Sequence, residues 1–160
     1  MERLWAPWRI QYIENADRED GCIFCLFPAA NDDPAHLILL RGQTAFIILN
    51  AFPYSNGHLM VTPYRHTANL DDLSDRELLE LMTLTRRAVN LLRVAFHPDG
   101  FNIGVNMGRV AGAGIADHVH IHVVPRWHGD TNFMTVLGDT RVIPEDLSAV
   151  YARLKDRIDG

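Results

Sequence analysis

The first part of the chain alternates between short apolar runs and turn-forming residues, a pattern typical of β-strands. Residues 36–40 and 44–49 are rich in aliphatic side chains, and the polar triplet 41–43 between them predicts a β-hairpin. Residues 50–57 contain Pro, Ser, Asn and Gly and therefore predict a loop. A third strand is expected directly after it, over residues 58–62.

After position 74 the apolar residues recur every three or four positions, which predicts an amphipathic helix. Ser74 and Glu77 have the spacing of a capping box, in which each side chain accepts a hydrogen bond from the other residue's backbone N–H. The sequence HPDG at residues 97–100 ends this long helix. Its apolar stripe consists of Leu78, Leu81, Met82, Thr85, Ala88, Val89, Leu92, Ala95 and Phe96.

The second half of the chain predicts two more strands and a final helix. Residues 101–106 and 118–124 have the composition of strands, and Pro125 ends the second of them. Pro144 is favoured in the first turn of a helix, so a C-terminal helix is expected to begin there. Its apolar stripe consists of Leu147, Val150, Tyr151, Leu154 and Ile158. Strands interrupted by one long helix and followed by another predict an α+β fold with an antiparallel sheet.

Length and composition fit a single domain over residues 1–160, with residues 1–20 as an N-terminal arm. The net charge of −5 disfavours a protein that holds a polynucleotide by its phosphates. No apolar run approaches the ~20 residues that span a bilayer, and the first residues lack the apolar segment of a signal peptide. We therefore expect a cytoplasmic protein with no membrane partner.

Three of the eight histidines, His118, His120 and His122, fall within five residues. On a strand their side chains all point to one face, while the β-branched residues between them point to the other. Each imidazole needs a hydrogen-bond partner for at least one ring nitrogen, so three in a row favour a functional site. Imidazole suits two chemistries, namely ligation of a metal such as zinc and nucleophilic or acid–base work at phosphorus.

The segment before these histidines is rich in small residues. Residues 106–114 have the sequence NMGRVAGAG, and small side chains let backbone N–H groups approach an anion closely. Beside a row of histidines, such a loop favours phosphate as the ligand.

The sequence HVHIHVV at residues 118–124 resembles the signature of the histidine-triad family. Asn50, the Gly57-His58 pair ahead of an apolar strand, and the loop at residues 106–114 occur in the order found in that family. The resemblance thus covers residues 20–135. The segments LWAPWR and PRWHGDTNF resemble its prokaryotic branch, which includes diadenosine tetraphosphate phosphorylases.

The resemblance implies a histidine-triad-like fold and a nucleotidyl transferase or hydrolase that acts on dinucleoside polyphosphates. It implies that His120 attacks the α-phosphorus and forms a nucleotidyl–histidine intermediate, while His118 and His122 orient it and bind phosphate oxygens. His58 corresponds to a fourth active-site histidine. The implied nucleotide- and phosphate-binding residues are Asn50, Asn106, Gly112, Ala113, Gly114 and His122. The resemblance also implies a homodimer with a sheet that continues across the two-fold axis.

Two positions depart from the family's pattern. Many members carry Gln and then Ser or Thr at the places where this chain has Gly114 and Ile115. The missing side-chain hydrogen bonds lead to the hypothesis that the space admits inorganic phosphate as the acceptor, which gives phosphorolysis.

Phe46 and Ile48 of the early strands are candidates to sandwich the purine.

Cys22 and Cys25 form a C-x-x-C pair, which supplies half of a tetrahedral zinc site. Relatives in the family that carry this pair imply His66 and His118 as the other two ligands. Zn²⁺ would be structural there, tying a tight knuckle at residues 21–25 to the histidine strand and fixing the orientation of His118. A redox pair and two free core cysteines are the alternatives.

The sequence leaves other function classes open beside the leading one. The enzyme could act on nucleoside phosphoramidates or other nucleoside phosphates instead. A metalloenzyme with His118 and His120 as a metal pair needs further ligands at spacings that the following residues do not offer. A nucleotide-binding regulatory module with little turnover is another alternative. His36, His97 and His128 match no motif.

Overall fold

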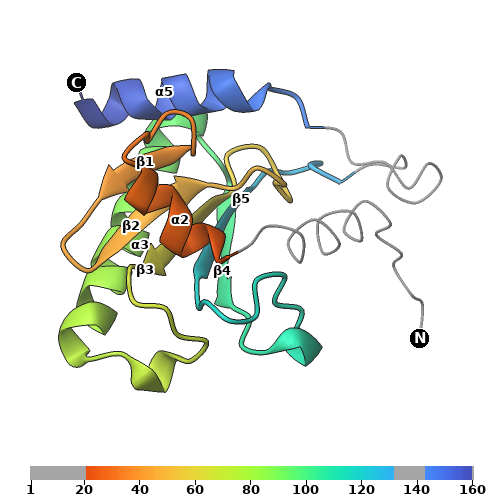
Figure 1. The fold of residues 1–160 in the computed structure, drawn as a ribbon. Helices are drawn as coiled ribbons and strands as arrows, with labels where there is room; N and C mark the ends of the chain where they lie inside the picture. The colour runs from red at the N-terminus through yellow and green to blue at the C-terminus, as the bar shows by residue number, and fades with distance from the viewer. Residues whose placement is uncertain (1–20, 132–142, 160) are drawn as a thin grey trace, which may run out of the picture.

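A five-stranded antiparallel sheet organises the chain (Figure 1). The computed structural model describes residues 21–131 and 143–159, so the predicted arm at residues 1–20 lies outside the described residues. The strands are β1 (Ile38–Arg41), β2 (Ala45–Leu49), β3 (Leu59–Pro63), β4 (Gly100–Val105) and β5 (Ile121–Arg126). Their order in the sheet is β1-β2-β3-β5-β4, and every neighbouring pair is antiparallel. The predicted α+β fold is therefore confirmed.

Helices lie on both faces of this sheet and along one of its edges (Figure 1). The helical elements are α2 (Ile23–Ala30), the short turn η1 (Leu70–Asp72), α3 (Asp75–Phe96), the short turn η2 (Arg109–Ala111) and α5 (Leu147–Asp159). The long helix α3 covers one face and contacts β2, β3 and β5, whereas α2 packs on the opposite face. The C-terminal helix α5 lies against β1 and α3.

Several element boundaries differ from the sequence prediction, most by one or two residues, and three differences have a local cause. The expected knuckle is the start of α2, for which Cys22 is the N-cap. The last strand begins at Ile121 rather than at residue 118. In the register of β3 and β5, Pro63 would lie opposite Val119, and proline has no N–H to continue the ladder. The C-terminal helix begins at Leu147 rather than at Pro144, because the Asp146 side chain caps it by accepting from the Ser148 N–H.

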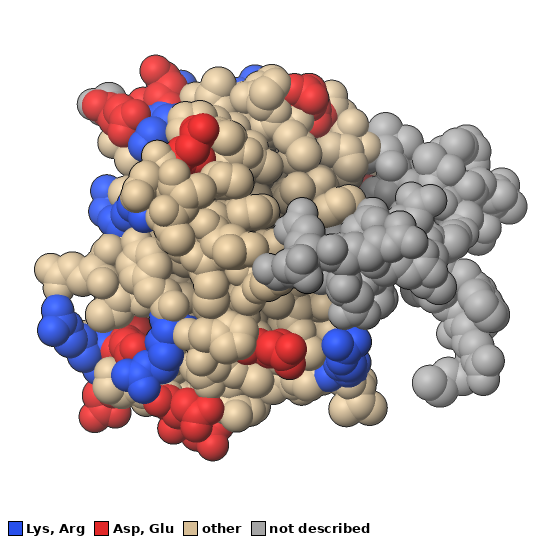
Figure 2. Space-filling model, viewed as in Figure 1, with Lys and Arg blue, Asp and Glu red and all other residues tan. Residues whose placement is uncertain are grey.

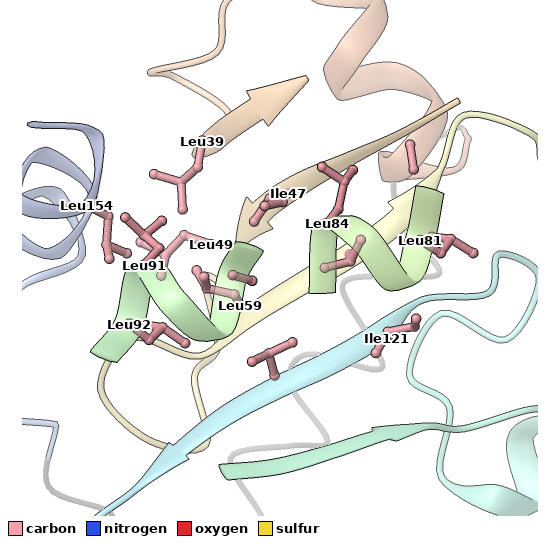
Figure 3. Packing of buried hydrophobic residues seen from close by; sticks show 14 of the residues in the cluster. Leu39, Ile47, Leu49, Leu59, Leu81, Leu84, Leu91, Leu92, Ile121 and Leu154 are labelled. Atoms are coloured by element: carbon pink, nitrogen blue, oxygen red, sulfur yellow. The ribbon is translucent and has the colours of Figure 1, made fainter. Parts of the chain in front are cut away.

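Alternate residues of the strands build two apolar clusters, one on each face of the sheet. The larger cluster lies between the sheet, α3 and α5 (Figure 3). It includes Val119, Ile121 and Val123, as the alternation of the histidine segment predicts. The smaller cluster lies under α2 and consists of Phe24, Ile38, Phe46, Ile48 and Met60. The histidines therefore share their face of the sheet with α2.

The capping box of α3 forms as predicted, with Ser74 accepting from the Glu77 N–H and Glu77 accepting from the Ser74 N–H at 2.8 Å. The apolar stripe of the helix is rotated slightly from the prediction. Met82 is 59% exposed, whereas Leu84 and Leu91, which the stripe omits, are buried. The stripe predicted for α5 is confirmed, because all its members lie in or against the larger cluster.

Charged side chains of both signs are spread around the margin of the face that carries α2, and its centre is largely uncharged (Figure 2). Among the described residues, no helix combines the length and apolar character needed to cross a membrane.

Side chains of α5 cover the polar edge of β1. The Tyr151 hydroxyl donates to the Ile38 carbonyl oxygen at 2.9 Å, and Lys155 Nζ donates to the Leu39 oxygen at 3.3 Å. An exposed strand edge is a site for unwanted pairing with other chains, so this cover both stabilises and protects the sheet.

We expect Tyr151→Phe to lower the free energy of unfolding by about 1 kcal/mol, because it leaves a buried carbonyl without its donor. Tyr64→Phe is the matched control, since the Tyr64 hydroxyl lies 3.4 Å from the Gly42 oxygen and its hydrogen bond is weaker. Urea denaturation of both variants measures the difference. An equal decrease in the free energy of unfolding in both variants would contradict the stabilising role of the hydrogen bond from α5 to β1.

Candidate active site and metal cluster

The sheet brings three histidines, His58, His120 and His122, together on the face that carries α2. Register pairs His122 of β5 with Met60 of β3, and His58 immediately precedes β3. His58 is fully buried and His120 almost fully buried. The rings of His120 and His122 lie 4.7 Å apart between centroids, and those of His58 and His122 lie 5.1 Å apart. Three of the four predicted catalytic histidines thus form one contiguous group.

His120 has a defined tautomer. Its Nδ1 lies 2.9 Å from the main-chain oxygen of His118, and a carbonyl oxygen can only accept, so Nδ1 carries the proton. Burial lowers the pKa of His120 below its usual value. The ring is therefore neutral near pH 7, with its lone pair on Nε2. Phe24 of α2 packs against this ring at 5.0 Å between centroids.

His58 and His122 form a direct hydrogen bond, with His58 Nε2 at 2.9 Å from His122 Nδ1. On its other side, His58 Nδ1 accepts from the main-chain N–H of Tyr54 at 3.1 Å. The side chain of Asn50 also contacts this nitrogen, at 3.3 Å. The predicted nucleotide-binding residue Asn50 is thus buried beside His58, and it also lines the neighbouring cavity.

Tyr54 is a site residue that the sequence prediction missed. Its ring lies 4.6 Å from that of His58 and is stacked on that of His122 at 5.7 Å between centroids. The ring thus holds both imidazoles from one side. Its position in a loop rich in turn-forming residues gives no periodic signal, so only the fold reveals the contact.

The ring of His118 is held by groups other than the three histidines described above. Its Nε2 donates to the Pro63 carbonyl oxygen at 2.8 Å, which leaves the Nδ1 lone pair facing Cys22 Sγ at 3.2 Å and Cys25 Sγ at 3.7 Å. Burial lowers the pKa of His118 to about 4, so the ring is neutral. Both ring nitrogens are therefore engaged by groups other than a phosphate.

Cys22, Cys25, His66 and His118 form a cluster whose ligand atoms all lie within 4.8 Å of one another. Two thiols and two imidazoles are a donor set of structural zinc sites. Burial, and after it the neighbouring Cys22, raises the pKa of Cys25 to about 11. A bound cation offsets both effects by stabilising the thiolate, so these residues fit a zinc ion. Zinc there would tie α2 to the segment that precedes β5.

A cavity of about 830 Å³ is connected to the histidine group through Asn50, which lines it and contacts His58, whereas His58, His120 and His122 are not among its lining residues. Asn50, Gly114, Ile115 and Ile48 line it, together with a stacked pair of rings, Phe27 and His36, 4.4 Å apart. Its size suits a nucleoside. Phe46, expected beside Ile48 at the purine, does not line this cavity. It is fully buried and stacks on Tyr64.

The small-residue loop contains the turn η2 and two glycines with positive φ, Gly108 and Gly112. The N–H groups of Gly112 and Ala113 donate within the loop, to the Arg109 and Gly108 oxygens. The Asn106 amide reaches the Gly112 oxygen at 3.5 Å. The loop is thus organised by its own hydrogen bonds, and it turns Gly114 toward the cavity.

The histidines without a motif lie in three different places. His36 is in the cavity wall, as described above. His97 is the exposed C-cap of α3 and has a left-handed conformation with φ 50°. His128 is exposed and pairs with Asp99 at 3.1 Å.

A histidine group on this sheet, beside a Cys/His cluster, defines a histidine-triad domain. Residues 32–129 match the HIT domain family, and the chain belongs to it. The predicted family is therefore confirmed.

Named relatives and solved structures agree with this assignment. An AP-4-A phosphorylase of Mycobacterium tuberculosis is 40% identical over 153 residues, covering 91% of this chain and 78% of the relative. An adenosine 5'-monophosphoramidase of Schizosaccharomyces pombe is 27% identical over 138 residues, covering 86% and 98%. A Zn-bound histidine triad protein from Mycobacterium smegmatis has a TM-score of 0.70 and 25% identity, covering 87% of this chain and 96% of that one. Both named relatives are enzymes of this family. The prediction of a histidine-triad-type enzyme is therefore confirmed.

We expect the purified protein to hold about one zinc ion per chain, since a closed Cys/His site binds through four ligands. His66→Ala should remove most of the metal, measured by elemental mass spectrometry. His36→Ala is the matched control, because His36 lines the same cavity but lies outside the cluster. Metal-free protein with two freely titratable thiols would contradict the site.

Proposed function

We propose that this protein is a nucleotidyl transferase that acts on dinucleoside polyphosphates through a covalent intermediate on His120. The observation that carries the proposal is the state of that ring, a neutral imidazole held by the His118 oxygen at 2.9 Å with its lone pair on Nε2. Such a nitrogen is a nucleophile that splits one displacement at phosphorus into two easier ones. The 40% identity to an AP-4-A phosphorylase supports the substrate class.

The neighbouring groups have roles that follow from their positions. His122 lies beside His120 and offers an N–H to phosphate oxygens, and His58 holds it in place. Hydrogen bonds directed at charge that develops in the transition state are commonly the largest catalytic contribution. The cavity that Asn50 and Gly114 line would hold the nucleoside end of the substrate. Asn106, Gly112 and Ala113 would shape the phosphate side through the loop that they organise.

Inorganic phosphate is the acceptor that we favour over water. Gly114 and Ile115 border the cavity and carry no side-chain donor, which leaves room for a second anion there. A nucleoside phosphoramidate hydrolase is the second candidate, because the relative from Schizosaccharomyces pombe bears that name.

Zinc in the Cys/His cluster would be structural and would fix His118, whose carbonyl oxygen holds the nucleophile. The chemistry that it supplies is the neutralisation of two thiolates. His118 then acts on His120 through its main chain, and the phosphate contacts fall to His122.

We also propose a cytoplasmic homodimer that forms through β4. This strand is at the edge of the sheet and pairs only with β5 among the described strands, and Ile103 on it is 49% exposed. The opposite edge, β1, is covered by α5. A second copy that pairs along β4 would continue the sheet.

Replacing the nucleophile tests the proposed reaction. His120→Asn should lower turnover of diadenosine tetraphosphate by more than about 1,000-fold, as expected for a lost nucleophile, and leave nucleotide affinity largely unchanged. Rapid quenching of the natural protein should trap an acid-labile nucleotide on His120. With phosphate present, the products should be ADP and ATP.

His97→Asn, at the exposed end of α3, is the control and should retain full activity. Full activity in His120→Asn would refute the nucleophile. ATP and AMP formed at equal rates with and without phosphate would refute phosphorolysis.

A further inference from the structure

The turn between α2 and β1 holds one residue in a conformation that its type rarely adopts. Leu37 has a φ of 60°, in the left-handed region, although it is not a glycine. Such a conformation is unfavourable for a residue with a Cβ atom, and it persists only where the surrounding structure fixes it. Strained backbone of this kind is concentrated at binding and catalytic sites. The side chain that this turn positions in the cavity wall is His36, directly before Leu37.

Hydrogen bonds on both sides of Leu37 fix the turn. Its N–H donates to the Pro34 oxygen at 3.4 Å, and its own oxygen accepts from the Leu49 N–H of β2 at 2.9 Å. The N–H of Ile38 donates to the Asp33 oxygen at 2.9 Å. The side chain of Leu37 packs against both apolar clusters of the sheet. The turn is therefore held in one conformation by contacts with the core and with the neighbouring strand.

An arginine of β1 ties this turn to α2. Nη2 of Arg41 donates to the Asp33 carboxylate at 2.7 Å and to the Pro28 carbonyl oxygen at 2.9 Å. Pro28 directly follows Phe27 in α2, and Asp33 lies in the turn that leads to His36. The guanidinium thus connects the two segments that carry the Phe27 and His36 rings. A side chain that is fixed before a ligand binds loses less conformational entropy on binding.

The rings of Phe27 and His36 form a stacked pair in the cavity wall. Their centroids lie 4.4 Å apart, and their planes make an angle of 20°. Both side chains are only partly buried, and both line the cavity. Phe27 also packs against the smaller apolar cluster, so it supports His36 from the side of the core. The face of the imidazole that points away from Phe27 is therefore the one available to a ligand.

We infer that His36 is a specificity-determining residue, whose ring stacks on the base of the bound nucleotide and discriminates between bases by the area of their rings. The inference rests on the proposed function, which assigns this cavity to the nucleoside end of the substrate. Every nucleobase has a π face that stacks on an aromatic side chain. A purine has two fused rings and a pyrimidine has one, so a purine buries more area against the imidazole and is stabilised more strongly.

AMP and CMP test the role of His36, because they share ribose and phosphate and differ only in the base. Isothermal titration calorimetry should show tighter binding of AMP than of CMP to the natural protein. His36→Ala should weaken AMP binding about tenfold and CMP binding no more than about twofold, as expected for a lost stacking contact. His36→Phe keeps an aromatic ring and should retain the natural affinity for AMP. His128→Ala, at an exposed histidine outside the cavity wall, is the matched control and should change neither affinity.

Circular dichroism establishes that each variant is folded. Equal affinities of the natural protein for AMP and CMP would overturn the inference, as would an unchanged affinity for AMP in His36→Ala. A loss of AMP affinity in His36→Phe as large as in His36→Ala would also overturn it, because stacking does not depend on the ring nitrogens. These results leave the transfer through His120 standing. A natural protein that binds neither nucleotide and forms no adduct on His120 would refute the proposed function instead.

Discussion

The position of Pro63 is the constraint on which the histidine site depends. Register pairs Val61 with Ile121, so Thr62 and Pro63 would follow opposite His120 and Val119. Proline has no N–H, and the ladder between β3 and β5 stops there. Val119 donates instead to the Thr67 oxygen at 2.7 Å, and the free Pro63 oxygen accepts from the His118 ring. Because the ladder between β3 and β5 ends here, His118 lies outside β5, and its ring contacts the Pro63 oxygen and the Cys22 thiol.

His118 connects two centres through different atoms. Its ring nitrogen faces the Cys22 and Cys25 thiols, while its main-chain oxygen holds the ring of His120. A metal ion bound to the ring would therefore restrain the peptide that orients the nucleophile, without contact with the substrate. The sequence-based roles assign both a ligand and a phosphate contact to the side chain of His118, and the sequence interpretation favours zinc there, with the phosphate left to His122 and the backbone. The position of the His118 ring beside the two thiols agrees with that choice. Geometry assigns the side chain of His118 to the cluster, and His122 is the neighbour of His120 that remains.

Periodic patterns predicted most of the fold, whereas the contacts among the candidate site residues could not be derived from them. The capping box of Ser74 and Glu77, the alternation at Val119 and Ile121, and the sheet follow from local spacing. The helix α2 was missed because Pro28 lies inside it and disfavours that prediction. Tyr54 was missed because its ring contact with His122 joins a loop to β5, which is far away along the chain. Such contacts depend on register, which sequence spacing does not give.

The main chain decides the protonation pattern of the whole site. Carbonyl oxygens hold His118 and His120, so the ring atoms that face them carry protons. At His58, by contrast, the main-chain N–H of Tyr54 donates to Nδ1, so the His58 proton is on Nε2. His122 therefore receives a hydrogen bond at its Nδ1 from His58. The rings of His120 and His122 lie 4.7 Å apart on one face of the sheet. Their free Nε2 atoms consequently differ in kind, since that of His120 has a lone pair and that of His122 has a proton. A nucleophile beside a donor is the arrangement that attack on an anionic phosphorus centre requires, because one group forms the bond while the other stabilises the charge.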